Sequence, residues 1–345
     1  MRYLKQEIEA FVSSNIPENT EVWSNEQVAA GSFTVGKTYT ILYVGTTNFT
    51  LIGASSNTIG TVFTATGVGS GTGTAMITYV AGDLLLLEPY IYKAVAINSD
   101  KRPDIYTGVY WVKWSVSNRL AMLDLSANSQ SEVIGADLVV VFNQVGIETL
   151  AIGNYEASGI KVEVLTADEL TVLWTYENKD FYNIAVDDYY SYIYEPYDFA
   201  VSRGIKIDIP VLGSKIRVTL YSSGIRAACG FLAGGLSVYM GETLWGVGFK
   251  YNSFAIKSTD DFGTLSVTKR AVQDLVDFET VFDSTYLMRI RQNIKSIYND
   301  IIVFIVEDDS NNYENLLTLG VVESASIVLS NSQKTTMTWS IVEAI

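Results

Sequence analysis

The chain has 345 residues, of which 23 are basic, 38 are acidic and none is histidine. Without histidine, Ser-His-Asp and Cys-His triads and histidine-ligated zinc or iron sites are excluded. The net charge of −15 argues against a nucleic-acid partner, because phosphate binding draws on clustered Lys and Arg. The length and a hydrophobic content of 48% predict two or three folded domains and exclude disorder.

The first residues, Met1 to Ala10, carry mixed charges and no apolar core, so we expect no signal peptide. The apolar runs elsewhere are far shorter than the roughly 20 residues that span a bilayer. We therefore expect a chain made in a cytoplasm and without membrane insertion. Leu4, Ile8 and Phe11 recur at helical spacing, which predicts a short amphipathic helix ended by Pro17.

Residues 30–77 form a block that is almost free of charge and rich in Gly, Thr and Ser. Alternating apolar residues predict short antiparallel strands with glycine turns, at Tyr39 to Tyr43, around Phe49 and Leu51, and around Phe63. The flanking segments 28–31 and 80–83 look like two halves of one hairpin. We therefore interpret the block as an inserted β module.

The rest of the chain reads as short strands bounded by turns, and the last hundred residues add one helix at 286–297. The predicted fold is mainly β and multi-domain, with an antiparallel, jelly-roll-like β-sandwich and a C-terminal α+β module. The predicted domains are an N-terminal β domain (1–29 with 78–130), the inserted module (30–77), the β-sandwich (131–250) and the C-terminal module (251–345).

Two glycine motifs resemble nucleotide-binding loops in sequence only. Gly31 to Thr38 matches G-x-x-x-x-G-K-T, but a phosphate loop follows a buried strand and opens a helix. The residues after Thr38 are β-branched and aromatic, so we predict a glycine turn into a strand. The glycines of 67–73 precede no helix and predict a flexible turn. We expect no cofactor.

Three other features have both a chemical and a structural reading. Adjacent acids at 187–188, 260–261 and 308–309 could bind a cation or serve glycoside hydrolysis, although Asp pairs are also common in turns. Cys229 lies in a small apolar run and is predicted to be buried. Aromatic side chains form the candidate interface or glycan-binding site, which consists of Trp174, Tyr189, Tyr190, Tyr192, Tyr194 and Tyr197.

Two groups of motifs resemble virion proteins of tailed bacteriophages. The block from Gly31 to Ala75 resembles a small module that recurs in structural proteins of these phages. The stretch from Trp111 to Asp124 resembles a W-x-x-x-x-x-x-N-R-x-A-M-x-D pattern of phage tail proteins. The segments 241–243 and 257–270 resemble the C-terminal module of the same proteins. The resemblance implies a component of the tail tip, baseplate or fibre-attachment region, and it supplies no catalytic residues.

We therefore expect a structural protein of a phage tail, located in the virion, with no enzymatic activity. Its expected partners are other tail proteins and further copies of itself in a homo-oligomer. The alternative is a module that binds a glycan of the host surface. A third possibility is a carboxylate-based depolymerase, which would need two acids about 5 to 9 Å apart.

Overall fold

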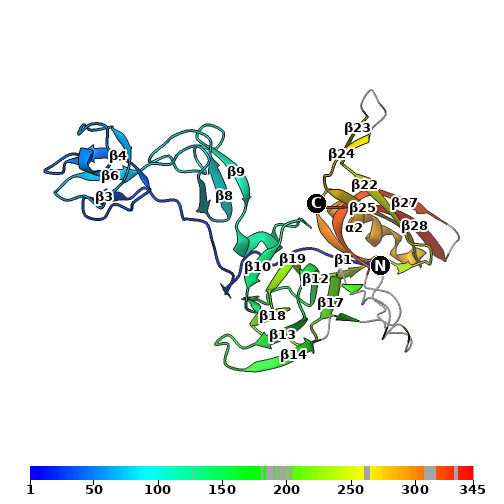
Figure 1. Ribbon diagram of the computed structural model, residues 1–345. Helices are drawn as coiled ribbons and strands as arrows, with labels where there is room; N and C mark the ends of the chain where they lie inside the picture. Colours follow the sequence, from blue (N-terminus) through cyan, green and yellow to red (C-terminus); the bar gives the residue numbers. More distant parts are fainter. Residues whose placement is uncertain are drawn as a thin grey trace. The chain divides into compact units, whose positions relative to one another are not determined.

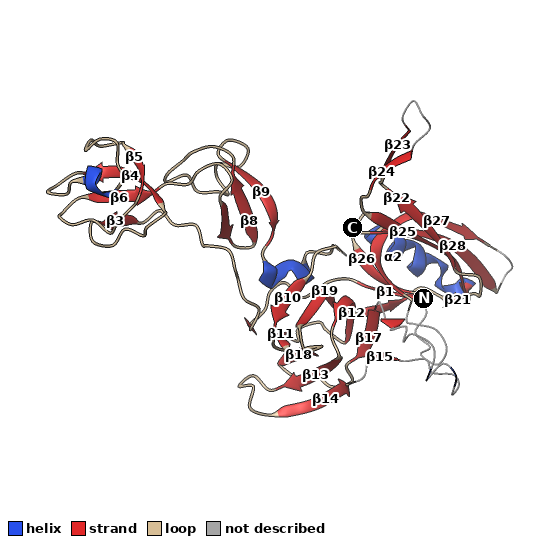
Figure 2. Cartoon of the chain, viewed as in Figure 1, coloured by secondary structure: helices blue, strands red, loops and turns tan. Residues whose placement is uncertain are grey.

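The computed structural model describes residues 1–126, 128–179, 182–183, 190, 193, 200–201, 204–259, 265–306, 316–329 and 333–344 (Figure 1). The chain is mainly β, with several antiparallel sheets and a short α-helix near the C-terminal end, as predicted (Figure 2). It divides into a smaller unit, Glu18–Ser117, and a larger unit formed by Met1–Pro17 and Asn118–Ile345. The four predicted domain boundaries stay a prediction.

The first part of the smaller unit is a four-stranded sheet with the order β3-β6-β4-β5. Its core is aromatic, with the ring of Phe33 packed between those of Tyr39, Phe49 and Phe63 at centroid distances of 5.0 to 5.9 Å. The aliphatic side chains of Ile41 and Ile52 complete this core. The strands are β3 (Gln27–Ala29), β4 (Thr38–Tyr43), β5 (Val62–Thr64) and β6 (Thr74–Ile77).

Two predictions for this sheet are wrong. Phe49 and Leu51 lie in a 3-10 helix, η1 (Phe49–Ile52), so Phe49 is fully buried and Leu51 is 80% exposed. The Asn48 side chain accepts a hydrogen bond from Thr50 N and caps this turn. Segment 28–31 does not form a hairpin with 80–83, because β3, which lies just before the predicted module, pairs with β6 within it.

The second part of the smaller unit is a three-stranded sheet with the order β7-β8-β9. Its buried side includes Trp111, whose indole Nε1 donates a hydrogen bond to Lys101 O and whose ring lies edge-on to Tyr79. The strands are β7 (Leu84–Leu87), β8 (Tyr90–Ala94) and β9 (Trp111–Val116). Strands were predicted at 84–88, 90–96 and 110–114, and each is present with slightly different bounds.

The larger unit contains a β-sandwich. A four-stranded sheet, β10-β19-β12-β17, and a five-stranded sheet, β14-β13-β18-β11-β2, bury a common core of aliphatic side chains. Residues alternate strictly between buried and half-buried along β18, as expected for strands that cover a core with one face. The strands are β2 (Ser13–Ser14), β10 (Ser131–Ile134), β11 (Leu138–Asn143), β12 (Thr149–Glu156), β13 (Gly159–Leu165), β14 (Val172–Asn178), β17 (Gly204–Asp208), β18 (Lys215–Tyr221) and β19 (Arg226–Gly235).

A 3-10 helix, η2 (Asn118–Leu123), precedes the sandwich and packs on it through Met122. A separate two-stranded ladder joins β15 (Tyr182–Asn183) and β16 (Ala200–Val201).

The C-terminal part of the larger unit is one sheet with the order β20-β1-β26-β27-β28-β25-β21, and β22 also pairs with β25. The helix α2 (Leu287–Ile297) buries Ile290, Ile294 and Ile297 in the core of this sheet. Its strands are β1 (Arg2–Leu4), β20 (Ser237–Tyr239), β21 (Glu242–Thr243), β22 (Gly248–Ser253), β25 (Val272–Asp283), β26 (Ile302–Ile305), β27 (Leu317–Val328) and β28 (Lys334–Glu343). The turn η3 (Ser284–Tyr286) leads into α2, and β23 (Ile256–Thr259) pairs with β24 (Leu265–Thr268) in a hairpin.

The predicted N-terminal helix is wrong, because residues 2–4 form the strand β1 between β20 and β26. Leu4 is buried in a small cluster where the C-terminal sheet meets the sandwich, together with Phe231 and Val303. Ile8 and Phe11 instead enter the core of the sandwich. The spacing of Leu4, Ile8 and Phe11 therefore belongs to an extended segment that contacts two separate cores, and not to a helix.

Candidate interaction surfaces

Of the predicted aromatic site, Trp174 and Tyr190 lie within the described residues. Trp174 and Tyr176 lie on β14 opposite Val164 and Val162 of β13. Because those valines face the core, the two aromatic rings cover the edge of the sandwich core, where they stack at 6.5 Å. Trp174 thus has a packing role, while Tyr190 is exposed. The remaining members of the predicted site, Tyr189, Tyr192, Tyr194 and Tyr197, lie outside the described residues.

Charged groups cover the outer face of the five-stranded sheet. Glu163 is buried and accepts from Lys161 Nζ at 2.7 Å, with Arg217 NH1 at 3.5 Å. Arg217 also approaches Glu169, which accepts from Lys215 Nζ at 2.7 Å. The hydrogen bond from Lys215 holds the pKa of Glu169 below its usual value. These charges pair with one another, so this face does not present an unsatisfied charge to a ligand.

The G-x-x-x-x-G-K-T segment forms a turn into a strand, as predicted. Gly31 and Gly36 have φ values of +99° and +88°, which suit glycine in turns, and Thr38 begins β4. The Lys37 ammonium forms an ion pair with Glu21. The described part of the smaller unit contains no α-helix and the loop leads into β4, so the arrangement that holds phosphates is absent there.

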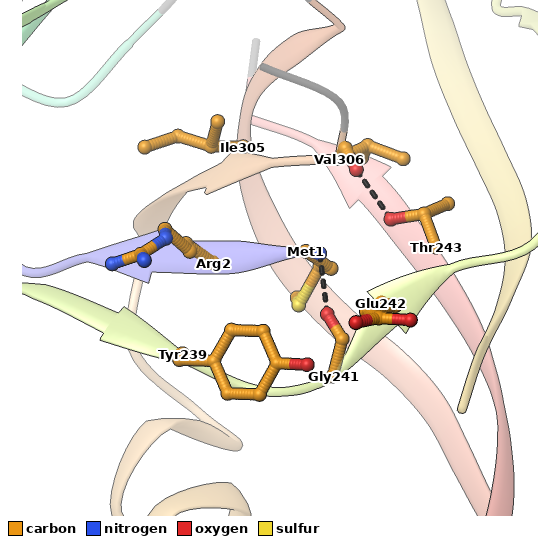
Figure 3. Close-up of a pocket in the computed structure, with 8 residues that line it drawn as sticks. All are labelled: Met1, Arg2, Tyr239, Gly241, Glu242, Thr243, Ile305 and Val306. Atoms are coloured by element: carbon orange, nitrogen blue, oxygen red, sulfur yellow. Dashed lines mark hydrogen bonds between the residues drawn. The ribbon is translucent and has the colours of Figure 1, made fainter. Parts of the chain in front are cut away.

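A pocket of about 270 Å³ opens beside β1 in the larger unit (Figure 3). Its polar groups largely bind one another: the Met1 amino group donates to Gly241 O at 2.6 Å, and Thr243 Oγ1 donates to Val306 O. Burial raises the pKa of Tyr239, and the nearby Glu242 carboxylate adds to this effect. Among the described residues that line the pocket, Glu242 is the one acid, so these residues do not supply the carboxylate pair of a depolymerase.

Large apolar side chains are exposed at one edge of the C-terminal sheet. On β22, Phe249 and Tyr251 point to the same side and are 47% and 67% exposed. In the described ranges no further strand pairs with the outer edge of β22, so its backbone groups on that edge lack a ladder partner. Trp245, before this strand, is the most exposed of the large hydrophobic residues described.

The hairpin that follows β22 is exposed along both strands. Ile256, Leu265 and Val267 are exposed aliphatic residues, and β23 and β24 pair only with each other in the described structure. Figure 2 shows the hairpin running out from the end of β22. An isolated two-stranded hairpin is marginally stable in water, so a partner surface would stabilise it. Together, β22 and the hairpin form what we name the β22 edge, which comprises residues 245–259 and 265–268.

Cys229 is buried in β19, as predicted, and its thiol donates to Phe231 O at 3.3 Å. The acid pairs 187–188, 260–261 and 308–309 lie outside the described residues. Within the part of the chain that is described, no group of three or more Cys, Asp and Glu side chains is arranged to hold a metal ion. Over the same residues, no helix has the length and apolar character to cross a bilayer.

Comparisons with known proteins give little further guidance. No family model matches the chain, and no curated protein is similar to it. Among solved structures, the chain is similar to a fucose-binding module of Streptococcus pneumoniae, with 17% sequence identity and a TM-score of 0.24. The match covers 36% of this chain and 84% of the module. A superposition with so low a TM-score assigns neither fold nor ligand.

Proposed function

We propose that the chain is a structural protein of a tailed-phage virion and makes subunit contacts in the distal tail, baseplate or fibre-attachment region. The observation that carries the proposal is the β22 edge, where aromatic side chains and an unpaired strand edge are exposed together. Aromatic residues are enriched at protein interfaces, and an open strand edge is a template for pairing with another chain. The phage motifs in the sequence point to a virion as the assembly in which such contacts are made.

The partner that we propose for this edge is a second copy of the chain. Residues 249–273 contain four basic residues, Lys250, Lys257, Lys269 and Arg270, and two acidic residues, Asp260 and Asp261. The segment therefore has a net charge of +2 within a chain of net charge −15, and one of its four cations, Lys250, is paired with Asp277 of β25. A head-to-tail contact, in which this edge meets an acidic part of the other copy, is favoured by this difference in sign, and added salt should weaken it.

Sedimentation velocity on the full chain over a range of concentrations tests the association. We expect Tyr251→Lys and Phe249→Lys to weaken self-association roughly tenfold or more, as for truncation of a central interface residue. Val145→Lys is the matched control, because Val145 is exposed on a turn of the sandwich and outside the β22 edge. If the wild-type chain stays monomeric, or all three variants behave alike, the edge is not the interface.

Location in a virion needs a separate experiment. Particles produced from the genome that encodes the chain should contain it by mass spectrometry. Cryo-electron microscopy of those particles should place the chain in the distal tail. Purified particles that lack the chain would contradict the virion assignment, whatever the outcome of the sedimentation experiment.

A further inference from the structure

Three lysines in the second part of the smaller unit lie over aromatic rings. The Nζ atoms of Lys93, Lys101 and Lys113 are 4.5, 5.0 and 3.3 Å from the ring centroids of Trp114, Tyr106 and Tyr90, respectively. Significant cation–π contacts occur about once per 70 to 80 residues in proteins. Here three fall within residues 90–114, which marks this segment as an unusual concentration of cations and aromatic rings.

None of these three lysines forms an ion pair with a described carboxylate. Lys37 of the same unit is paired with Glu21, and Arg102 with Asp104. In a chain with 38 acidic and 23 basic residues, most cations could find an acidic partner within the protein. The positive charges of Lys93, Lys101 and Lys113 are therefore available to an anion from outside the chain.

A β-bulge sets the position of Trp114. The pairing register of β8 with β9 shifts between Ile91 and Tyr92, so that Lys113 pairs with Tyr92, Ser115 pairs with Ile91, and Trp114 has no opposite residue. Bulges commonly re-aim a side chain. The indole is 58% exposed and lies on β9, which is an edge strand of this sheet in the described structure (Figure 1).

The side chains beside the indole form a mostly apolar row. Leu84 of β7 is opposite Lys93 of β8, which is in turn opposite Val112 of β9. Leu84 and Val112 are exposed, and the Lys93 ammonium lies over the ring of Trp114. The row therefore combines an aromatic surface, two aliphatic neighbours and one cation on adjacent strands. We name these four residues the Trp114 face.

We propose that the Trp114 face binds an acidic saccharide, meaning a sugar that carries a carboxylate or a phosphate. On binding, the Lys93 ammonium would move from above the indole to pair with the anionic group, and the indole would stack on the apolar C–H side of the sugar ring. A hydrophobic protein segment would not use the cations. Neutral sugars would use only the stacking surface.

Nucleic acid fits this surface less well than a short acidic saccharide. Binding to single strands combines base stacking with a positively charged groove that follows many phosphates. Residues 18–117 contain five basic and seven acidic residues, so the unit offers only a small local excess of cations around Trp114. A single-stranded oligonucleotide is therefore a competing ligand to include in the test.

Isothermal titration calorimetry on the full chain tests the proposal with four probes: trigalacturonic acid, mannose 6-phosphate, neutral galactotriose and a ten-nucleotide oligothymidylate. We expect the carboxylate or the phosphate sugar to bind at least about tenfold more tightly than galactotriose, with affinity falling as salt is added. The stronger of the two acidic probes identifies the anion. Failure of both acidic probes to bind, equal affinity for galactotriose, or tighter binding of the oligonucleotide would overturn the proposal.

Variants then locate the site. Trp114→Ala should weaken the acidic probe roughly tenfold or more, as loss of a stacking surface does. Lys93→Gln should remove the preference for the acidic over the neutral probe. Lys37→Gln and Trp245→Ala are matched controls that change the same residue types elsewhere and should leave binding unchanged. Equal losses in the controls would contradict the site, and circular dichroism checks that each variant is folded. Because the titration measures binding by the isolated chain, its result is independent of the self-association experiment.

Discussion

Trp339 donates a hydrogen bond from its indole Nε1 to Thr280 Oγ1 at 3.0 Å, and both residues are completely buried in the core of the C-terminal sheet. They lie on neighbouring strands, β28 and β25, where the Trp339 ring also stacks on Phe278. An apolar core can hold the polar N–H group of an indole only if an acceptor is built into it. The threonine hydroxyl is that acceptor.

Thr280→Val should therefore destabilise the larger unit although it preserves the shape of the side chain. The indole N–H would lose its acceptor in an apolar core, which typically costs about 1–3 kcal/mol. Thr280→Ser, which keeps the hydroxyl, is the matched control and should lose less. Urea denaturation followed by circular dichroism measures the free energy of unfolding of the two variants. A Val variant as stable as the wild type would show that the hydrogen bond contributes nothing.

Gly73→Ala should destabilise the smaller unit. A Cβ atom at this position would lie 2.6 Å from Val44 O and 2.8 Å from the ring of the buried Phe49. Neither neighbour can move freely, so we expect a loss of about 3 kcal/mol, at the upper end for overpacking. Gly31→Ala is the control: its Cβ would meet nothing within 4 Å, and only its φ of +99° opposes the change, at about 1–2 kcal/mol. Equal thermal shifts for the two variants would argue against a close approach at Gly73.

The strands were predictable where one face covers a core. Along β18 the alternation of apolar and polar residues is visible in the sequence, and the apolar residues of α2 recur at helical spacing. The prediction failed where the same spacing had another origin, at Leu4 and Ile8, which enter different cores. Around Phe49 the alternation concealed a single helical turn, although Asn48 and Gly53 supply its capping residues.

The candidate surfaces were less predictable than the fold. Whether Trp174 faces solvent or the core depends on its pairing with Val164, which no local pattern specifies. The contact of Lys93 with Trp114 depends on the bulge between β8 and β9, because a regular ladder would place that tryptophan opposite a residue of β8. The signal that was available is the presence of three lysines among the aromatic residues of 90–114, which by itself predicts no more than strands.

Stability should depend on pH through Tyr221 and Glu177. The Tyr221 hydroxyl donates to Glu177 Oε1 at 2.5 Å. Burial and this hydrogen bond raise the pKa of Tyr221 to about 12, and the hydrogen bond lowers the pKa of Glu177. The contribution of Tyr221 to the free energy of unfolding is fully present below the unfolded-state pKa of about 10. It is lost as pH rises through about 12. The glutamate contribution is present above its unfolded pKa of about 4.5 and is lost as pH falls through its lower folded value.

Tyr221→Phe removes the hydrogen-bond donor to Glu177. It should therefore reduce the loss of stability at high pH and the loss at low pH. The difference in urea midpoint between wild type and this variant should be largest from about pH 5 to pH 9 and should shrink toward either extreme. Midpoints measured from about pH 3 to about pH 12 test the expectation, because the changes lie outside the plateau. A difference that does not change with pH would mean that the phenol contributes through packing alone.

Cys229 should react with a thiol reagent only when the sandwich opens. The side chain is buried in β19, and burial raises the pKa of its thiol to about 12, so that little thiolate exists at pH 8. Because the chain contains one cysteine, labelling with a disulfide reagent reports on this position alone. We expect negligible labelling of the native protein within minutes, one equivalent at once in denaturant, and a rate between these limits that follows the opening of the sandwich as urea is added. Complete labelling of the native chain during mixing would contradict the packing of β19 between β10 and β12.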